Sequence, residues 1–184
     1  MARAQATDPL HNFRFHVRAT AVDGIGSDPL QPNGEPSPGV GDSAEAGFQS
    51  VTTPEYTVES AEYREGLKTY TEKYPGIPTT NDITMARGVS RIDTAFHTWV
   101  LAAIEGREYR ADLTIFHAMR TGRTSPFNPD TNFTQANSKR YIVRQAWPMR
   151  VKIAGDLDSS ASDVSLAEVD VAFEQFDVAV PTAA

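Results

Sequence analysis

The side chains most able to do metal or acid–base chemistry are few and poorly grouped. The histidines of this 184-residue chain are His11, His16, His97 and His117, and no two are spaced to share a helix face. The H-E-x-x-H pattern, by which a helix holds zinc, is absent. Without cysteine, thiolate metal sites, disulfides and a cysteine nucleophile are excluded. The residues therefore predict no metal centre.

Paired carboxylates are the next candidates. Glu168 and Asp170 stand two positions apart, so they share one face of a strand. Such a pair can serve acid–base catalysis, or it can face water or line a channel. No serine lies in a nucleophile elbow, and Gly24-Ile25-Gly26 precedes a proline-rich segment rather than the helix that a dinucleotide loop requires. These residues therefore form no recognisable catalytic or cofactor-binding motif.

Charge is distributed unevenly along the chain. The net charge is −7, which argues against a protein that reads phosphate backbones. Residues 139–152 carry basic side chains and no acid, whereas the chain after Lys152 carries acids and no base. Two interpretations follow: complementary faces of neighbouring subunits, or neighbouring strands that neutralise each other within one subunit.

Alternation of apolar and polar residues predicts a mainly β protein. The expected strands span residues 12–20, 48–62, 83–89, 109–119, 139–153 and 164–178. In the last of these, Glu168, Asp170 and Glu174 lie on one face and Val169, Val171 and Phe173 on the other. Residues 63–74 are polar and aromatic and are typical of a hairpin arm, with a turn at 75–78.

One helix is expected over about residues 94–105. Asp93 is a good N-cap residue, and Gly106 stands where a left-handed C-cap is expected. The predicted apolar stripe consists of Phe96, Trp99, Val100, Ala103 and Ile104. We expect one domain over residues 1–184: a small β-barrel or sandwich of packed antiparallel sheets, flanked by this helix and carrying long loop insertions at about 23–47 and 120–138.

An ordered series of short motifs resembles the tail tube proteins of contractile-tailed bacteriophages, which are related to inner tube proteins of type VI secretion and extracellular contractile injection systems. The motifs run through most of the chain: residues 8–15 (DPLHNFRF), 47–51 (GFQSV), 62–66 (EYREG), 75–77 (PGI), 82–89 (DITMARGV), Trp99 and 146–148 (AWP). The two long loops depart from the family pattern.

This resemblance implies a structural role without catalysis or cofactor. It implies hexameric rings stacked into a hollow tube inside a contractile sheath, serving as a conduit for the viral genome. The partners implied are other copies of the chain, the sheath, the baseplate or initiator, the tail terminator, the tape measure protein, and double-stranded DNA held in the lumen without sequence-specific binding. The expected location is the virion tail, assembled in the host bacterial cytoplasm, with no membrane partner.

Three sets of residues receive expected roles. Lumen-facing candidates are Glu168, Asp170 and Glu174, because an acidic lumen would repel DNA phosphates. Candidates for contact between rings are the arm charges Glu62, Arg64, Glu65, Lys68, Glu72 and Lys73. Residues expected to act structurally are Gly66, Pro75, Gly76, Arg87, Gly88, Trp99, Trp147 and Pro148.

Three alternatives remain open on the sequence. The first is the inner tube of an extracellular or type VI-like injection system, which carries effectors instead of a genome. The second is a soluble β-barrel that binds a small ligand between the long loops. The third is a hydrolase or other enzyme whose site no motif reveals. A tube protein forms rings or filaments, whereas a binding module stays small and is stabilised by its ligand.

Overall fold

The computed structural model describes residues 10, 12, 15–21, 30, 48–66, 68–89, 91, 93–107, 109–118, 138–155, 157, 158, 160 and 162–180. Its elements are β1 (Phe15–Ala21), β2 (Ser50–Val51), β3 (Tyr56–Tyr63), β4 (Glu72–Thr80), β5 (Ile83–Gly88), α1 (Ala95–Ile104), β6 (Ala111–Ala118), β7 (Ser138–Lys152), β8 (Leu166–Ala172) and β9 (Gln175–Ala179). His11, most of the first motif and nearly all of both predicted loops lie outside these residues. No described helix is long and apolar enough to cross a bilayer.

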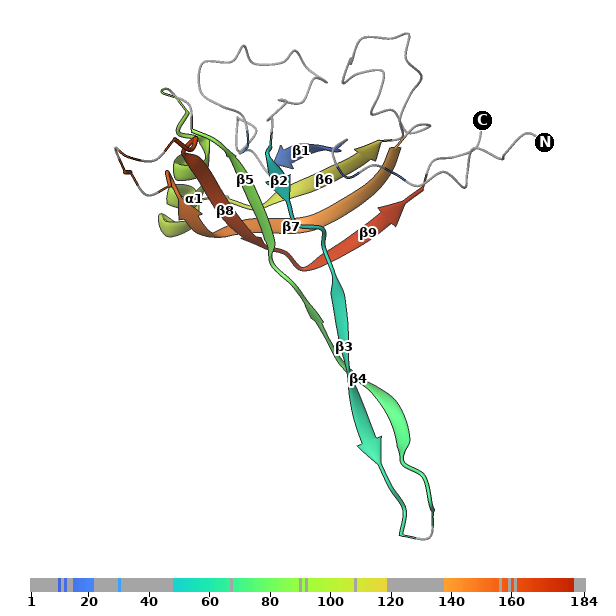
Figure 1. Ribbon diagram of the computed structural model, residues 1–184. Coiled ribbons are helices and arrows are strands. Elements are labelled where there is room, and N and C mark those ends of the chain that lie inside the picture. Colours follow the sequence, from blue (N-terminus) through green and yellow to red (C-terminus); the bar gives the residue numbers. More distant parts are fainter. Residues whose placement is uncertain are drawn as a thin grey trace, which may run out of the picture.

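The body is an antiparallel sheet folded over on itself (Figure 1). Its strands follow the order β1-β6-β7-β8-β5-β2, and β9 also pairs with β7. The first half of β7 pairs with β6 and β9, and its second half pairs with β8. One long strand thus joins two packed layers, which confirms the predicted mainly β, sandwich-like fold. The described strands do not close into a barrel.

The core forms from the apolar face of each strand. Burial alternates along β8, where Ala167, Val169 and Val171 point inward. The partner strands β1, β5, β6 and β7 supply fully buried residues from their matching faces: Val17, Ile83, Met85, Leu113 and Val143. A two-residue period buries one face of each strand and leaves the other polar, as the alternation predicts.

Helix α1 packs against β7 and lies close to its predicted position. Gly106 has φ +68°, and the N–H groups of Gly106 and Arg107 donate to the carbonyls of Ala103 and Ala102, so the left-handed C-cap is confirmed. Asp93 serves the helix from one residue before the N-cap position, because its Oδ1 accepts from the Ala95 N–H at 3.0 Å.

The predicted buried stripe of α1 is partly wrong. Phe96 and Trp99 are buried, but Ile104 is 73% exposed. Ala95 and Ala102 complete the buried face instead. The helix is rotated toward its small residues because the large rings of Phe96 and Trp99 need alanines beside them for α1 to approach the sheet closely.

Strands β3 and β4 form a two-stranded arm that projects from the body (Figure 1). The predicted turn at residues 75–78 is wrong, since these residues lie within β4 and the chain reverses between Tyr63 and Glu72. Every residue of β3 is exposed. The predicted last strand, 164–178, is two strands, because pairing is interrupted at Phe173 and Glu174.

Candidate assembly surfaces

The charged residues predicted for contact between rings gather toward the tip of the arm. They are Glu62 on β3, Arg64, Glu65 and Lys68 in the turn, and Glu72 and Lys73 on β4. Lys68 Nζ lies 2.6 Å from Glu72 Oε1 and 3.3 Å from Glu65 Oε2. Lys73 Nζ lies 3.2 Å from Glu62 Oε1. Ion pairs near the surface are screened by water and contribute little to stability, so these charges remain available to a partner.

Glu72 accepts two side-chain hydrogen bonds in the arm. Its carboxylate accepts from Lys68 Nζ and from the Tyr74 hydroxyl, the latter at 2.7 Å. The hydrogen bond from Lys68, followed by that from Tyr74, lowers the pKa of Glu72. The hydrogen bond between Tyr74 and Glu72 also raises the pKa of Tyr74. Glu72 is therefore ionised, and Tyr74 is a neutral donor, throughout the neutral pH range.

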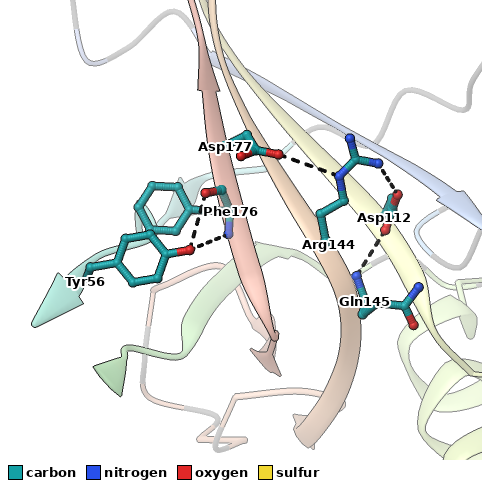
Figure 2. A network of polar contacts seen from close by, with 6 residues as sticks. All are labelled: Tyr56, Asp112, Arg144, Gln145, Phe176 and Asp177. Atoms are coloured by element: carbon teal, nitrogen blue, oxygen red, sulfur yellow. Dashed lines mark hydrogen bonds and ion pairs between the residues drawn. The ribbon is translucent and has the colours of Figure 1, made fainter. Parts of the chain in front are cut away.

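The root of the arm is held by a ring stack that the sequence analysis did not identify (Figure 2). The rings of Tyr56 on β3 and Phe176 on β9 lie 4.3 Å apart at an interplanar angle of 16°. The Phe176 N–H donates to the Tyr56 hydroxyl at 2.9 Å, and that hydroxyl donates to the Phe176 carbonyl at 3.4 Å. This contact fixes the arm to the body across 120 residues of sequence.

A second cluster lies where β7 bends (Figure 2). Gln145 has φ 55°, a conformation that is uncommon outside glycine, and the pairing of β6 with β7 shifts register beside it. Asp112 stabilises the bend because its Oδ1 accepts from the Gln145 N–H at 3.0 Å and its Oδ2 lies 3.1 Å from Arg144 Nη1. Arg144 also reaches Asp177 on β9, at 3.8 Å.

The three lumen candidates each have an arginine partner within the subunit. Arg150 Nε donates to Asp170 at 2.5 Å, and Arg150 Nη2 lies 3.5 Å from Glu168. Arg110 pairs with Glu174. The hydrogen bond from Arg150 is the main cause that lowers the pKa of Asp170, and Thr84 adds a second hydrogen bond.

These pairs support the second interpretation of the charge pattern, in which neighbouring strands neutralise each other within one subunit. The basic strand β7 lies beside the acidic strands β8 and β9, and its arginines neutralise their acids within one subunit. All three candidate acids remain on the polar face, since Val169, Val171 and Phe173 point into the core as predicted. The face is therefore charge-paired rather than simply acidic.

Arg87 belongs to a buried cluster behind α1. Its Nη2 lies 2.6 Å from Asp93 Oδ2, and both side chains are nearly inaccessible to water. Nη1 donates to the Leu30 carbonyl at 2.7 Å, and the guanidinium lies 4.0 Å from the centre of the Phe96 ring. A buried arginine requires such partners, and these contacts are consistent with a structural role for Arg87.

The other residues expected to be structural occupy varied sites. Trp99 is buried and donates from Nε1 to the Tyr109 carbonyl at 2.6 Å. Trp147 is half-buried with its ring edge toward Tyr109, and Pro148 is fully buried opposite Val171. Gly66 lies in the turn of the arm, Pro75 and Gly76 lie in β4, and Gly88 ends β5.

The described residues contain no group of three or more histidine, aspartate or glutamate side chains able to hold a metal ion. What they contain is a projecting arm, a ring stack at its root and a charge-paired outer face.

The fold is shared with chains from contractile assemblies. A chain in the extended sheath–tube complex of the PVC extracellular contractile injection system is 17% identical, with a TM-score of 0.68 and complete coverage of both chains. A chain in the baseplate structure of the anti-feeding prophage is 15% identical, with a TM-score of 0.68 over 96% of this chain and 99% of that one. An Hcp protein is 10% identical, with a TM-score of 0.51 over 86% and 87%.

Residues 11–177 match the family model described as T4-like virus tail tube protein gp19. Because the match spans most of the chain, this protein belongs to that tail tube family. The resemblance inferred from the motif series is thereby confirmed. No curated protein sequence matches the chain.

Proposed function

We propose that this chain is a single-domain tube subunit that forms hexameric rings, stacked into the hollow inner tube of a contractile tail. The observation that carries the proposal is the family match over residues 11–177. The projecting arm supports it, because an exposed two-stranded ribbon is at best marginally stable alone and gains stability when another chain covers it. The phage form of the proposal has the tube serve as a genome conduit in the virion tail, assembled in the bacterial cytoplasm.

The charged side chains of the arm are proposed to contact the next ring. Ring stacking is heterologous, with the top of one ring against the bottom of the next, so it yields an open filament. The exposed acids and bases at the tip provide both signs of charge for such a contact. Long-range complementarity of this kind sets register more than affinity.

The polar face that carries Glu168, Asp170 and Glu174 is proposed to line the lumen. Since Arg150 and Arg110 pair with these acids, the wall would be hydrophilic and close to neutral. DNA phosphates would find neither an uncompensated basic patch to bind nor a strongly repelling surface. The tape measure protein and double-stranded DNA would thus pass without specific binding.

The proposed outer partners are the sheath, the baseplate or initiator and the tail terminator. Chains with this fold occur in a sheath–tube complex, a baseplate and a tube-terminating cap of contractile particles. Those particles are extracellular injection systems or the anti-feeding prophage, so an inner tube that carries effectors is the second candidate function. Recovery of intact particles and identification of the lumen content as DNA or protein would separate the two.

The first test is negative-stain electron microscopy of the purified chain over a concentration series. The proposal expects six-fold rings or hollow filaments. Uniform small particles at every concentration, unchanged by an added baseplate complex, would contradict it.

A further inference from the structure

The two outer edges of the arm differ in their main-chain chemistry. Strand β4 contains Pro75 and Pro78, whereas β3 contains no proline over its eight residues. Proline has no N–H and cannot donate to a neighbouring strand, so it is found on edges that must not pair. Within the described residues, each strand of the arm pairs only with the other.

The pairing pattern shows which amides point outward. The Asn81 N–H donates to the Glu55 carbonyl at 3.3 Å, which makes these two residues a hydrogen-bonded pair. Hydrogen-bonded and non-hydrogen-bonded pairs alternate in an antiparallel ribbon. Tyr56–Thr80 and Val58–Pro78 are therefore non-hydrogen-bonded pairs, and their main-chain groups point away from the partner strand.

Past this point a bulge in β4 moves the register, and Ser60 pairs with Pro75. Proline has no N–H, so it is tolerated in a strand only where its position donates no hydrogen bond to the partner strand. The main-chain groups of Ser60 and Pro75 therefore also point away from the opposite strand of the arm. The outer edge of β3 thus presents the N–H groups of Tyr56, Val58 and Ser60. The outer edge of β4 lacks a donor at both Pro75 and Pro78.

An exposed edge with a complete set of donors and acceptors is a template for strand addition, and natural proteins block such edges unless they are used. Here one edge is blocked and the other is open. We propose that the outer edge of β3 accepts a strand from a second copy of this chain, while the edge of β4 stays unpaired. The inference rests on the proposed tube assembly, and it identifies the surface through which the arm makes its contact.

The accepting contact is heterologous. If β3 paired with β3 of another copy, the interface would be two-fold and would close as a dimer, whereas an open filament requires head-to-tail contacts. The body offers an edge for this purpose, since β1 pairs with a single described strand. Main-chain hydrogen bonds would supply the contact, with the arm's exposed side chains setting its register.

A pair of proline substitutions tests the edge directly. Val58→Pro removes a donor from the outer edge of β3, and Thr80→Pro removes one from the outer edge of β4; neither removes a hydrogen bond between the two strands. We expect Thr80→Pro to assemble like the wild type. We expect Val58→Pro to raise the concentration needed for filaments about tenfold or more, which corresponds to about 1.4 kcal/mol per subunit contact.

Two controls accompany the pair. Val58→Thr keeps the N–H and a β-branched side chain, so it should assemble at nearly the wild-type concentration. Hydrogen exchange of the unsubstituted chain, compared between assembled and dispersed forms, should show protection gained over residues 56–62 and none over residues 73–80. This second measurement does not depend on whether any variant folds.

Several results would overturn the inference. They are equal assembly of both proline variants, equal failure of both, failure of Thr80→Pro alone, or exchange protection gained on β4 rather than β3. Wild-type filaments with an unprotected β3 would reject the edge and leave the proposed tube intact. If the wild-type chain forms no rings or filaments, the proposed function fails and this inference fails with it.

Discussion

At the level of single residues, we expect the free energy of unfolding to depend on the buried charge of Arg87 and on the ionisation of His16. Arg87 and Asp93 are paired out of water, whereas Lys73 and Glu62 are paired in it, at similar distances. Breaking a buried pair costs more stability because it leaves a charge without a partner and without water, whereas water solvates an exposed charge that loses its partner. His16 is a second case, since its environment opposes the charged imidazolium.

Arg87→Ala should lower the free energy of unfolding by about 3–5 kcal/mol, because Asp93 would remain buried without its partner. Lys73→Ala, which breaks an exposed pair, should cost no more than about 1 kcal/mol. Urea unfolding followed by circular dichroism measures both. Equal small losses in the two variants would show that the Arg87 cluster does not hold the body together.

His16 should make the body acid-sensitive in a defined window. Burial, followed by the positive charge of Arg18, lowers the pKa of His16 from 6.5 to about 4. The unfolded chain therefore binds a proton that the folded chain refuses, and stability falls as pH drops from 6.5 to about 4. The stability of His16→Asn, measured by urea unfolding, should fall less than that of the wild type over this window; parallel curves would contradict the assignment.

At the scale of elements, the arm and the body depend on different physics. The body buries apolar faces from strands distant in sequence, while β3 and β4 are joined chiefly by main-chain pairing. The bulge in β4 places Gly76 and Ile77 opposite Glu59, and a Cβ on Gly76 would lie 2.8 Å from the Glu59 carbonyl oxygen. Glycine is required there by close backbone approach.

Gly76→Ala should disturb the arm and spare the body. The added methyl group would force β3 and β4 apart at the bulge, so amide protection should fall over residues 56–63 and 72–80 while the main unfolding transition stays in place. Gly66→Ala is the matched control, because nothing lies within 4 Å of a Cβ at that position. Hydrogen exchange followed by mass spectrometry measures amide protection in both variants. Unchanged protection in Gly76→Ala would refute the steric argument.

At the level of the complete chain, a body with one buried core carries an arm whose strand β3 is exposed throughout. Tyr56 and Phe176 set the direction in which the arm leaves the body. An arm whose direction is fixed can place its open edge repeatedly in the same position on successive copies. Pre-orientation of this kind reduces the entropy lost when subunits associate.

Replacement of residues 57–79 by a short linker should separate folding from assembly. The body should unfold at a concentration of urea close to that of the full chain, since its core residues are all retained. Rings or filaments should be lost, as judged by electron microscopy and sedimentation. A deletion variant that still polymerises would exclude the arm as the contact between rings.

Local preferences and the family can both be inferred from the amino-acid order alone. Alternation placed Val169, Val171 and Phe173 in the core, and Gly106 marked the end of α1, because burial period and backbone conformation are properties of short segments. The motif series pointed to the tail tube family without help from coordinates. The buried face of α1 was predicted less well, because the sheet against which the helix packs selects which of two adjacent helix faces is buried.

Which segments lie side by side is known from the folded chain and not from local sequence patterns. Alternation states which face of a strand is apolar but not which strand lies beside it, so the partners of Arg150, Arg110 and Arg144 could not be read from spacing. The proline-containing segment of β4 carries a local turn signal that pairing with β3 overrides. The stack of Tyr56 on Phe176 joins residues 120 positions apart, and no local preference encodes a contact that exists only after the chain has folded.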